Sequence, residues 1–205
     1  MHLYEDLAQL GKSPKFLQRV RSRERVLNVK NVRKGVKARR GDGTFGESIP
    51  DAPLVEDPSF LVARGPIATV EIGVEVKIVA KAMMKQIDRV MSDLVKQVEH
   101  FKRGGGNPIC LGIVGINASP AYTSYEADRA FLANGTKYAK PASEALETER
   151  RLLAEARPRF TELLVLRFRA TNVEPFPFEW VSYKDTAEQY GAILVRISRE
   201  YEKRF

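Results

Sequence analysis

The segment VEIGVEVKIVAK, residues 70–81, predicts a buried β-strand because valine and isoleucine dominate it. Side chains alternate across a strand, so its charged residues fall on one face, together with Gly73. Glu75 and Lys77 are nearest neighbours on that face, roughly 6.6 Å apart along the strand. We expect the opposite, apolar face to pack on helices, and it consists of Val70, Ile72, Val74, Val76 and Ile78.

The pattern changes on both sides of this strand. Downstream, apolar residues recur at helical spacing over residues 83–101, and the apolar run 109–116 predicts a strand buried on both faces. Upstream, three extended pieces separated by turns predict an antiparallel meander, at residues 52–55, 60–63 and 67–79. Further helices are predicted at residues 1–10, 142–156 and 186–203, and further strands at 162–170 and 176–181. Two more helices are predicted from their first residues: one begins at Pro14 with Ser13 as its cap, and one begins at Thr123 with a capping box to Glu126.

The order of the predicted helices and strands indicates one mixed α/β domain over residues 1–205, with a basic helical and loop segment at 1–46. Apolar residues make up 43% and charged residues 29% of the 205 residues. Neither a signal region nor a membrane-length apolar run is present, so we expect a cytoplasmic protein without a membrane partner. A single cysteine, Cys110, excludes an intrachain disulfide, and with two histidines it cannot form a Cys/His zinc cluster.

Positive charge is concentrated near the start of the chain. Residues 11–40 hold twelve lysines and arginines against one acidic residue, Glu24. This asymmetry predicts a polyanionic partner such as nucleic acid, and the alternative is a solvated basic surface. The predicted nucleic-acid contacts are Arg33, Lys34, Lys37, Arg39 and Arg40.

Two short motifs give the chain a resemblance to the PD-(D/E)xK nuclease superfamily. They are Pro50-Asp51, before the predicted meander, and Glu75-Val76-Lys77 within it. The resemblance implies an α/β fold with a restriction-endonuclease-like core. In that core a mixed central sheet, with an antiparallel meander carrying the site and then a parallel strand, is flanked by helices. It also implies a Mg²⁺-dependent nuclease acting on DNA, with Mn²⁺ as a substitute, RNA as a further possible substrate, and a possible homodimer.

The same resemblance assigns roles to individual residues. Asp51, Glu75 and the backbone carbonyl of Val76 would hold the metal, since hard cations take oxygen ligands. Lys77 would orient the attacking water or stabilise the transition state. A glutamine on the following helix would complete the site, and Gln86 is the candidate nearest in sequence to Lys77.

Several alternatives remain open at this stage. Asp57 competes for the role of Asp51, and Glu71 could reach the metal only across a bulge at Gly73. An additional acidic residue could come from Glu24 or Glu47, and Gln97 borders the same apolar stripe as Gln86. Tyr122 and Tyr125, after the buried strand, could stack on a base or contact a phosphate. The alternative functions are a catalytically inactive nucleic-acid-binding or assembly protein that keeps the nuclease fold, and an unrelated α/β protein with a coincidental E-x-K.

Overall fold

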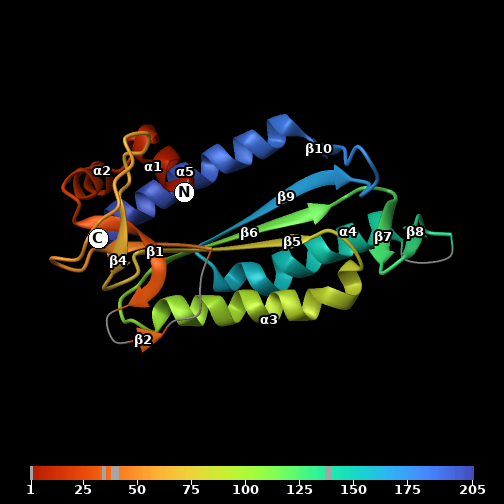
Figure 1. The fold of residues 1–205 in the computed structure, drawn as a ribbon, viewed down its shortest axis with the longest axis horizontal. Coiled ribbons are helices and arrows are strands. Elements are labelled where there is room, and N and C mark those ends of the chain that lie inside the picture. The colour runs from red at the N-terminus through yellow and green to blue at the C-terminus, as the bar shows by residue number, and fades with distance from the viewer. Residues whose placement is uncertain (1, 34–35, 38–41, 137–139) are drawn as a thin grey trace.

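The computed structural model describes residues 2–33, 36–37, 42–136 and 140–205, and its centre is a mixed β-sheet with helices on both faces (Figure 1). The strand order is β10-β9-β6-β5-β3-β1-β2, and β4 pairs with β1 outside this order. In chain order the elements are α1 (His2–Leu10), α2 (Pro14–Arg21), β1 (Arg25–Arg33), β2 (Val36–Lys37), β3 (Gly43–Glu47), β4 (Arg64–Ile67), β5 (Ile72–Val79), α3 (Met83–Lys102), β6 (Ile109–Asn117), β7 (Tyr122–Glu126), β8 (Arg129–Ala133), α4 (Pro141–Arg151), a π-helical turn (Leu152–Ala156), a short 3-10 helix (Arg157–Arg159), β9 (Glu162–Ala170), β10 (Phe178–Trp180) and α5 (Tyr183–Arg204).

The sheet combines parallel and antiparallel pairs. Strands β5, β6 and β9 are parallel neighbours, whereas β3 runs antiparallel to both β5 and β1. Parallel neighbours need a crossover connection, and α3 and α4 supply the two crossovers on one face of the sheet. Helices α1, α2 and α5 cover the other face (Figure 1). No helix in the described part of the chain is long and apolar enough to cross a membrane.

Several predicted elements are confirmed. The α3 helix, the buried strand β6, the strand β9 and the last helix α5 lie where apolar periodicity placed them. Helix α2 begins at Pro14, and the Ser13 hydroxyl accepts a hydrogen bond from the Phe16 backbone N–H at 3.1 Å. Long apolar patterns and a capping serine therefore identified their elements correctly.

The predicted meander is wrong in its first two strands. Within residues 52–63 the structure has an isolated bridge from Val55 to Arg64 and no strand, and the meander is formed by β1, β3 and β5 instead. Its first strand comes from the basic segment, where Arg25, Asn28 and Lys30 separate the apolar residues and obscure a strand pattern. Residues 25–33 and 43–47 thus belong to the central sheet.

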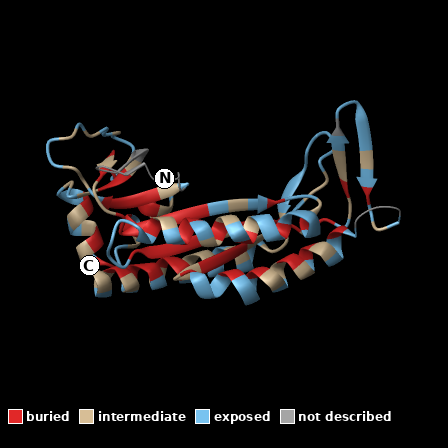
Figure 2. Cartoon of the chain, turned by 90° about the horizontal axis from the view of Figure 1, so that it is seen from below, coloured by how far each residue is buried: buried red, intermediate tan, exposed pale blue. Residues whose placement is uncertain are grey.

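The helix predicted from Thr123 is also wrong, because residues 122–133 form the antiparallel hairpin β7–β8. Tyr122 and Ala133 pair directly and are both buried, and the Thr123 N–H donates to the Thr171 carbonyl at 2.8 Å. These tertiary contacts fix the base of the hairpin and outweigh a local capping pattern. The hairpin extends away from the sheet at the end opposite both chain termini, and most of it is exposed (Figures 1 and 2).

The faces of β5 differ from the prediction. Val76 is 37% and Ile78 69% exposed, so the second half of the expected apolar face is not covered by helices. A Cβ at Gly73 would lie 2.5 Å from the ring of Phe101 on α3, so the face with Gly73 and Glu75 is the one that packs on this helix. Glu75 is therefore buried, with 5% exposure.

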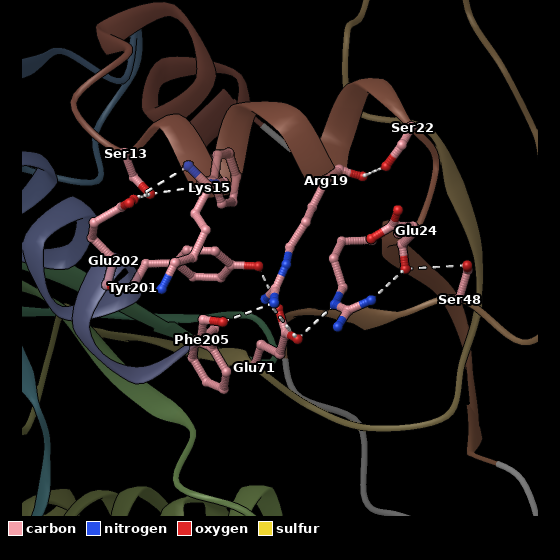
Figure 3. Close-up of polar contacts among 12 residues, drawn as sticks. Ser13, Lys15, Arg19, Ser22, Glu24, Ser48, Glu71, Tyr201, Glu202 and Phe205 are labelled. Carbon is pink, nitrogen blue, oxygen red and sulfur yellow. Dashed lines mark hydrogen bonds and ion pairs between the residues drawn. The ribbon is translucent and has the colours of Figure 1, made fainter.

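Glu71 lies at the entrance to β5, where it joins two helices to the sheet (Figure 3). Its carboxylate accepts a 2.5 Å hydrogen bond from Arg25, lies 3.6 Å from Arg19 of α2, and accepts the hydroxyl proton of Tyr201 on α5. Burial, followed by the neighbouring Glu71 charge, raises the pKa of Tyr201. Glu71 is only 5% exposed and its carboxylate contacts Arg19, Arg25 and Tyr201, so it is not placed as the metal ligand considered from sequence.

We predict that Glu71→Gln lowers the free energy of unfolding by about 3 kcal/mol, because it leaves two arginines beside a neutral amide. The matched control is Glu56→Gln, which removes an exposed ion pair with Arg23 and should cost less than about 1 kcal/mol. Urea unfolding of both variants measures the difference. If both variants lose the same free energy of unfolding, the buried Glu71 cluster stabilises the fold no more than the exposed Arg23–Glu56 pair does.

Candidate functional site

Glu75 and Lys77 form an ion pair on the face of β5 that packs on α3. The Lys77 Nζ lies 2.5 Å from Oε1 of Glu75, and the lysine side chain is 27% exposed against 7% for the glutamate. The pair therefore joins a buried carboxylate to an ammonium group that reaches the surface. The structure brings these two predicted residues together.

Asp42 is the acidic residue that the fold places beside this pair. Gly43 pairs with Val74, and continuing this antiparallel register by one residue sets Asp42 opposite Glu75. Directly opposed residues share a face, with Cβ atoms about 4.5–5.5 Å apart. The Oδ2 atom of Asp42 accepts a 2.7 Å hydrogen bond from the backbone N–H of Val76, which holds the carboxylate at the edge of β5.

The sequence prediction missed Asp42 and chose Asp51 in its place. Asp51 is exposed in a turn at the opposite end of β3, where the Ala52 N–H donates to the Ile49 carbonyl at 3.2 Å. The register of β3 with β5 directs that end toward the start of β5 and away from Glu75. One signal could have identified Asp42: it immediately precedes the glycine-containing segment 43–47. That segment forms β3, the strand that pairs with the Glu75-Val76-Lys77 strand.

The other acidic candidates lie away from the pair. Asp57 accepts a hydrogen bond from the Ser59 N–H within a local turn, at 2.9 Å. Glu47 is exposed at the same end of β3 as Asp51, and Glu24 lies between α2 and β1. Across this register, Asp42 is the carboxylate that faces Glu75.

The structure distinguishes the two candidate glutamines on α3. Gln86 is exposed and donates to the Lys81 carbonyl at 3.0 Å. Gln97 is 2% exposed and lies one turn before Phe101, whose ring faces Gly73. Gln97 lies one helical turn from Phe101, about 5.4 Å along α3, and Glu75 lies two residues from Gly73, about 6.6 Å along β5. Because Phe101 contacts Gly73 and α3 runs back along β5, these similar lengths set Gln97 at the level of Glu75. Among the described residues, the Nε2 of Gln97 has no hydrogen-bond partner.

The predicted nucleic-acid contacts fall in the least described part of the chain. Arg33 ends β1 and Lys37 ends β2, and both precede Asp42 in the sequence. Lys34, Arg39 and Arg40 lie outside the described residues. Their role stays a prediction from charge.

The donor atoms at the pair suit a hard divalent cation. Asp42 and Glu75 offer carboxylate oxygens, and Val76 between Glu75 and Lys77 offers a carbonyl. Mg²⁺ typically binds through one or two carboxylates and completes its shell with water and phosphate oxygens. Within the described ranges, no group of three or more His, Cys, Asp or Glu side chains is placed to hold a metal ion. A cation here would therefore depend on the Asp42–Glu75 pair together with substrate oxygens.

No family model, known protein or solved structure matches this chain. The chemistry of the site is thus argued from its own residues.

We predict that Gln97→Leu raises the free energy of unfolding by about 1 kcal/mol, because it removes a buried amide whose Nε2 makes no hydrogen bond to the described residues. The control is Gln86→Leu on the exposed face of the same helix, with an expected change within about 0.5 kcal/mol. Chemical denaturation measures both. If Gln97→Leu lowers the free energy of unfolding, the Gln97 amide stabilises the fold, and its burial is then no argument for a role at the Glu75 site.

Proposed function

We propose that this protein is a metal-dependent nuclease that hydrolyses phosphodiester bonds of DNA. The observation that carries the proposal is that Asp42, immediately before β3, binds the backbone of β5 beside the Glu75–Lys77 ion pair. Two carboxylates and one ammonium group are the residue types that metal-assisted phosphodiester hydrolysis requires. The resemblance of Glu75-Val76-Lys77 to the PD-(D/E)xK motif supports the same reaction, with Asp42 taking the place of Asp51.

The arrangement of the sheet also supports the proposal. An antiparallel meander of β1, β3 and β5 carries the site, α3 crosses one face, and β6 adds in parallel beside β5. This is the order of elements that a restriction-endonuclease-like core implies. Fold-level analogy alone does not establish a reaction, so the site residues remain the main argument.

Each residue has a distinct role in the proposed reaction. Asp42, Glu75 and the Val76 carbonyl would hold Mg²⁺, or Mn²⁺ in its place, which when bound lowers the pKa of water and neutralises phosphate charge. Lys77 places a positive charge where the phosphate becomes more negative in the transition state. The Glu75 carboxylate holds this ammonium group in place through the 2.5 Å contact.

We predict that the purified protein cuts DNA with Mg²⁺ or Mn²⁺ and not in EDTA. Asp42→Asn, Glu75→Gln and Lys77→Met should each lower the cleavage rate at least about a hundredfold, since each removes a metal ligand or the charge at the phosphate. Asp51→Asn is the matched control and should cut at the wild-type rate, because Asp51 lies beyond the other end of β3.

A plasmid-nicking assay with these four variants tests the assignment. If Asp51→Asn abolishes cutting and Asp42→Asn does not, the site is misplaced. If the wild-type protein binds DNA but never cuts it with any divalent metal, the alternative of a non-catalytic nucleic-acid-binding or assembly protein replaces the nuclease.

DNA as the partner is supported by the charge of the segment that leads into the site. Twelve basic residues lie between positions 11 and 40, and the last of them, Arg39 and Arg40, directly precede the loop with Asp42. RNA would meet the same charges, and a homodimer stays a prediction.

We predict that replacing Arg39 and Arg40 together by glutamine weakens DNA binding and reduces the slope of log K against log salt by about 1.8, because each lost phosphate contact removes about 0.9 from that slope. The control replaces two exposed basic residues elsewhere, Arg150 on α4 and Lys184 on α5. Binding titrations at several salt concentrations measure both slopes. The same slope in both double variants would remove the basic segment from the interface.

A further inference from the structure

A cavity of about 450 Å³ lies at the carboxyl ends of β5, β6 and β9, beside the base of the β7–β8 hairpin. Its lining combines the ends of β5 and β6 with the hairpin and the loop before β10, and includes Ala80, Lys81, Asn117, Thr123, Phe176 and Phe178. In open α/β sheets, the carboxyl ends of parallel strands are the usual place for a ligand. Neither the proposed metal site nor the basic segment uses this cavity.

Two phenylalanine rings give the cavity an exposed aromatic wall. Phe176 is 64% and Phe178 57% exposed, although burial would stabilise both. Phe178 is supported from behind by Phe168, stacked at 5.2 Å between ring centroids with an interplanar angle of 24°. The wall is therefore a supported aromatic surface that faces solvent.

The loop before β10 holds this wall in an unfavourable backbone conformation. Asn172 and Phe176 both have a φ of 58°, in the left-handed region. Such a φ is uncommon for a bulky residue such as phenylalanine. Backbone strain of this kind concentrates at functional sites, where the surrounding structure maintains it.

Most polar atoms around the cavity are already used. The amide of Asn117 donates to the carbonyls of Ala80 and Ala170, and its Oδ1 accepts from two backbone N–H groups. The hydroxyl of Tyr122 accepts from the Ala82 N–H, and Asn172 donates to the Thr123 carbonyl. Among the described residues the ammonium of Lys81 has no partner, so the cavity offers aromatic surface and one positive charge.

The cavity lies at the end of the strand that carries the proposed site. Lys77 and Lys81 are separated along β5 and its extension by at most about 13 Å. Stacked nucleotides are spaced by about 3.4 Å along one strand, so about four nucleotides or fewer span this distance. Lys77 pairs with Val114, which pairs with Val165 on the α3 face of the sheet, whereas Phe178 stacks on Phe168 on the opposite face. A DNA strand whose phosphate lies at Glu75 and Lys77 would therefore reach the cavity by passing over the end of β5.

We propose that the cavity binds one unstacked base of the DNA strand that is cut, with the base stacked on Phe176 and the adjoining phosphate near Lys81. The inference rests on the proposed nuclease function and adds to it the way in which the substrate is positioned. Every base has a π-face, whereas the polar atoms around the cavity that could read a base edge are mostly occupied. The site therefore accepts any base with little sequence preference.

The test measures binding without cleavage, in EDTA, with a single-stranded oligodeoxynucleotide that carries one 2-aminopurine. We expect Phe176→Ala to weaken binding roughly tenfold. Phe176→Trp should restore binding, and Leu146→Ala, which removes a 72% exposed apolar side chain on α4, should leave it unchanged. Because the site has little sequence preference, the protein can bind the oligodeoxynucleotide in several registers, so the fluorescence of 2-aminopurine should rise on binding at any internal position. That rise should be absent with Phe176→Ala.

Two results would overturn the inference. One is wild-type affinity and an unchanged fluorescence profile in Phe176→Ala. The other is a change of sedimentation coefficient in Phe176→Ala without DNA, which would show that the aromatic wall covers a second copy of the chain. Failure of the nuclease proposal is distinguishable, because the cavity would then still bind the probe base in EDTA while Mg²⁺ produced no cleavage.

Discussion

The pairing of β3 with β5 is the constraint on which the proposed site depends. A Cβ at Gly46 would lie 1.9 Å from the Thr69 carbonyl oxygen, so only glycine lets β3 pass this close to the segment before β5. The Glu71 N–H donates to the Phe45 carbonyl at 2.9 Å and fixes the register at that point. A slip of one residue would turn Asp42 to the opposite face of the sheet, away from Glu75.

The two glutamates at β5 show how one segment can serve both stability and chemistry. Glu71 is surrounded by Arg19, Arg25 and the Tyr201 hydroxyl, so its buried charge is balanced by the folded chain itself (Figure 3). Glu75 lies beside Lys77, and the β3–β5 register continued by one residue sets Asp42 opposite it. Two neighbouring carboxylates repel each other, and a divalent cation relieves this repulsion. The first arrangement balances its charge within the protein, whereas the second is the place where we propose that a cation binds.

The predictability of the fold follows the strength of each local pattern. Apolar periodicity identified α3, β6, β9 and α5, because these elements bury one face or both faces over several turns or residues. It failed for β1 and β3, in which charged residues and glycines interrupt the apolar positions, and for the hairpin at residues 122–133, which tertiary contacts stabilise.

Asp51 and Gln86 lie away from Glu75 for a different reason, which is that distance along the sequence is a poor guide to distance in a folded sheet. Gln86 was preferred because it follows Lys77 closely, but α3 runs back along β5, so the later Gln97 lies level with Glu75. Asp51 was preferred for its preceding proline, but antiparallel pairing brings the start of β3 to the middle of β5, so Asp42 lies there instead. Glu75 and Lys77 were placed together correctly because alternation within one strand is a local rule.

The direction of the parallel strands relates the site to the aromatic cavity. β5 passes Glu75 and Lys77 before it ends at Ala80, where the buried Asn117 side chain links it to the end of β9. Asn117 also lines the cavity, and the hydrogen bonds of this link occupy its amide atoms. These atoms are then not available to distinguish one base from another. In the proposed complex, a DNA strand would be held by its phosphates at Glu75 and Lys77 and, beyond the end of β5, by stacking in the cavity. In the proposed nuclease both interactions would be independent of base identity, so any selectivity would come from the shape or flexibility of the DNA.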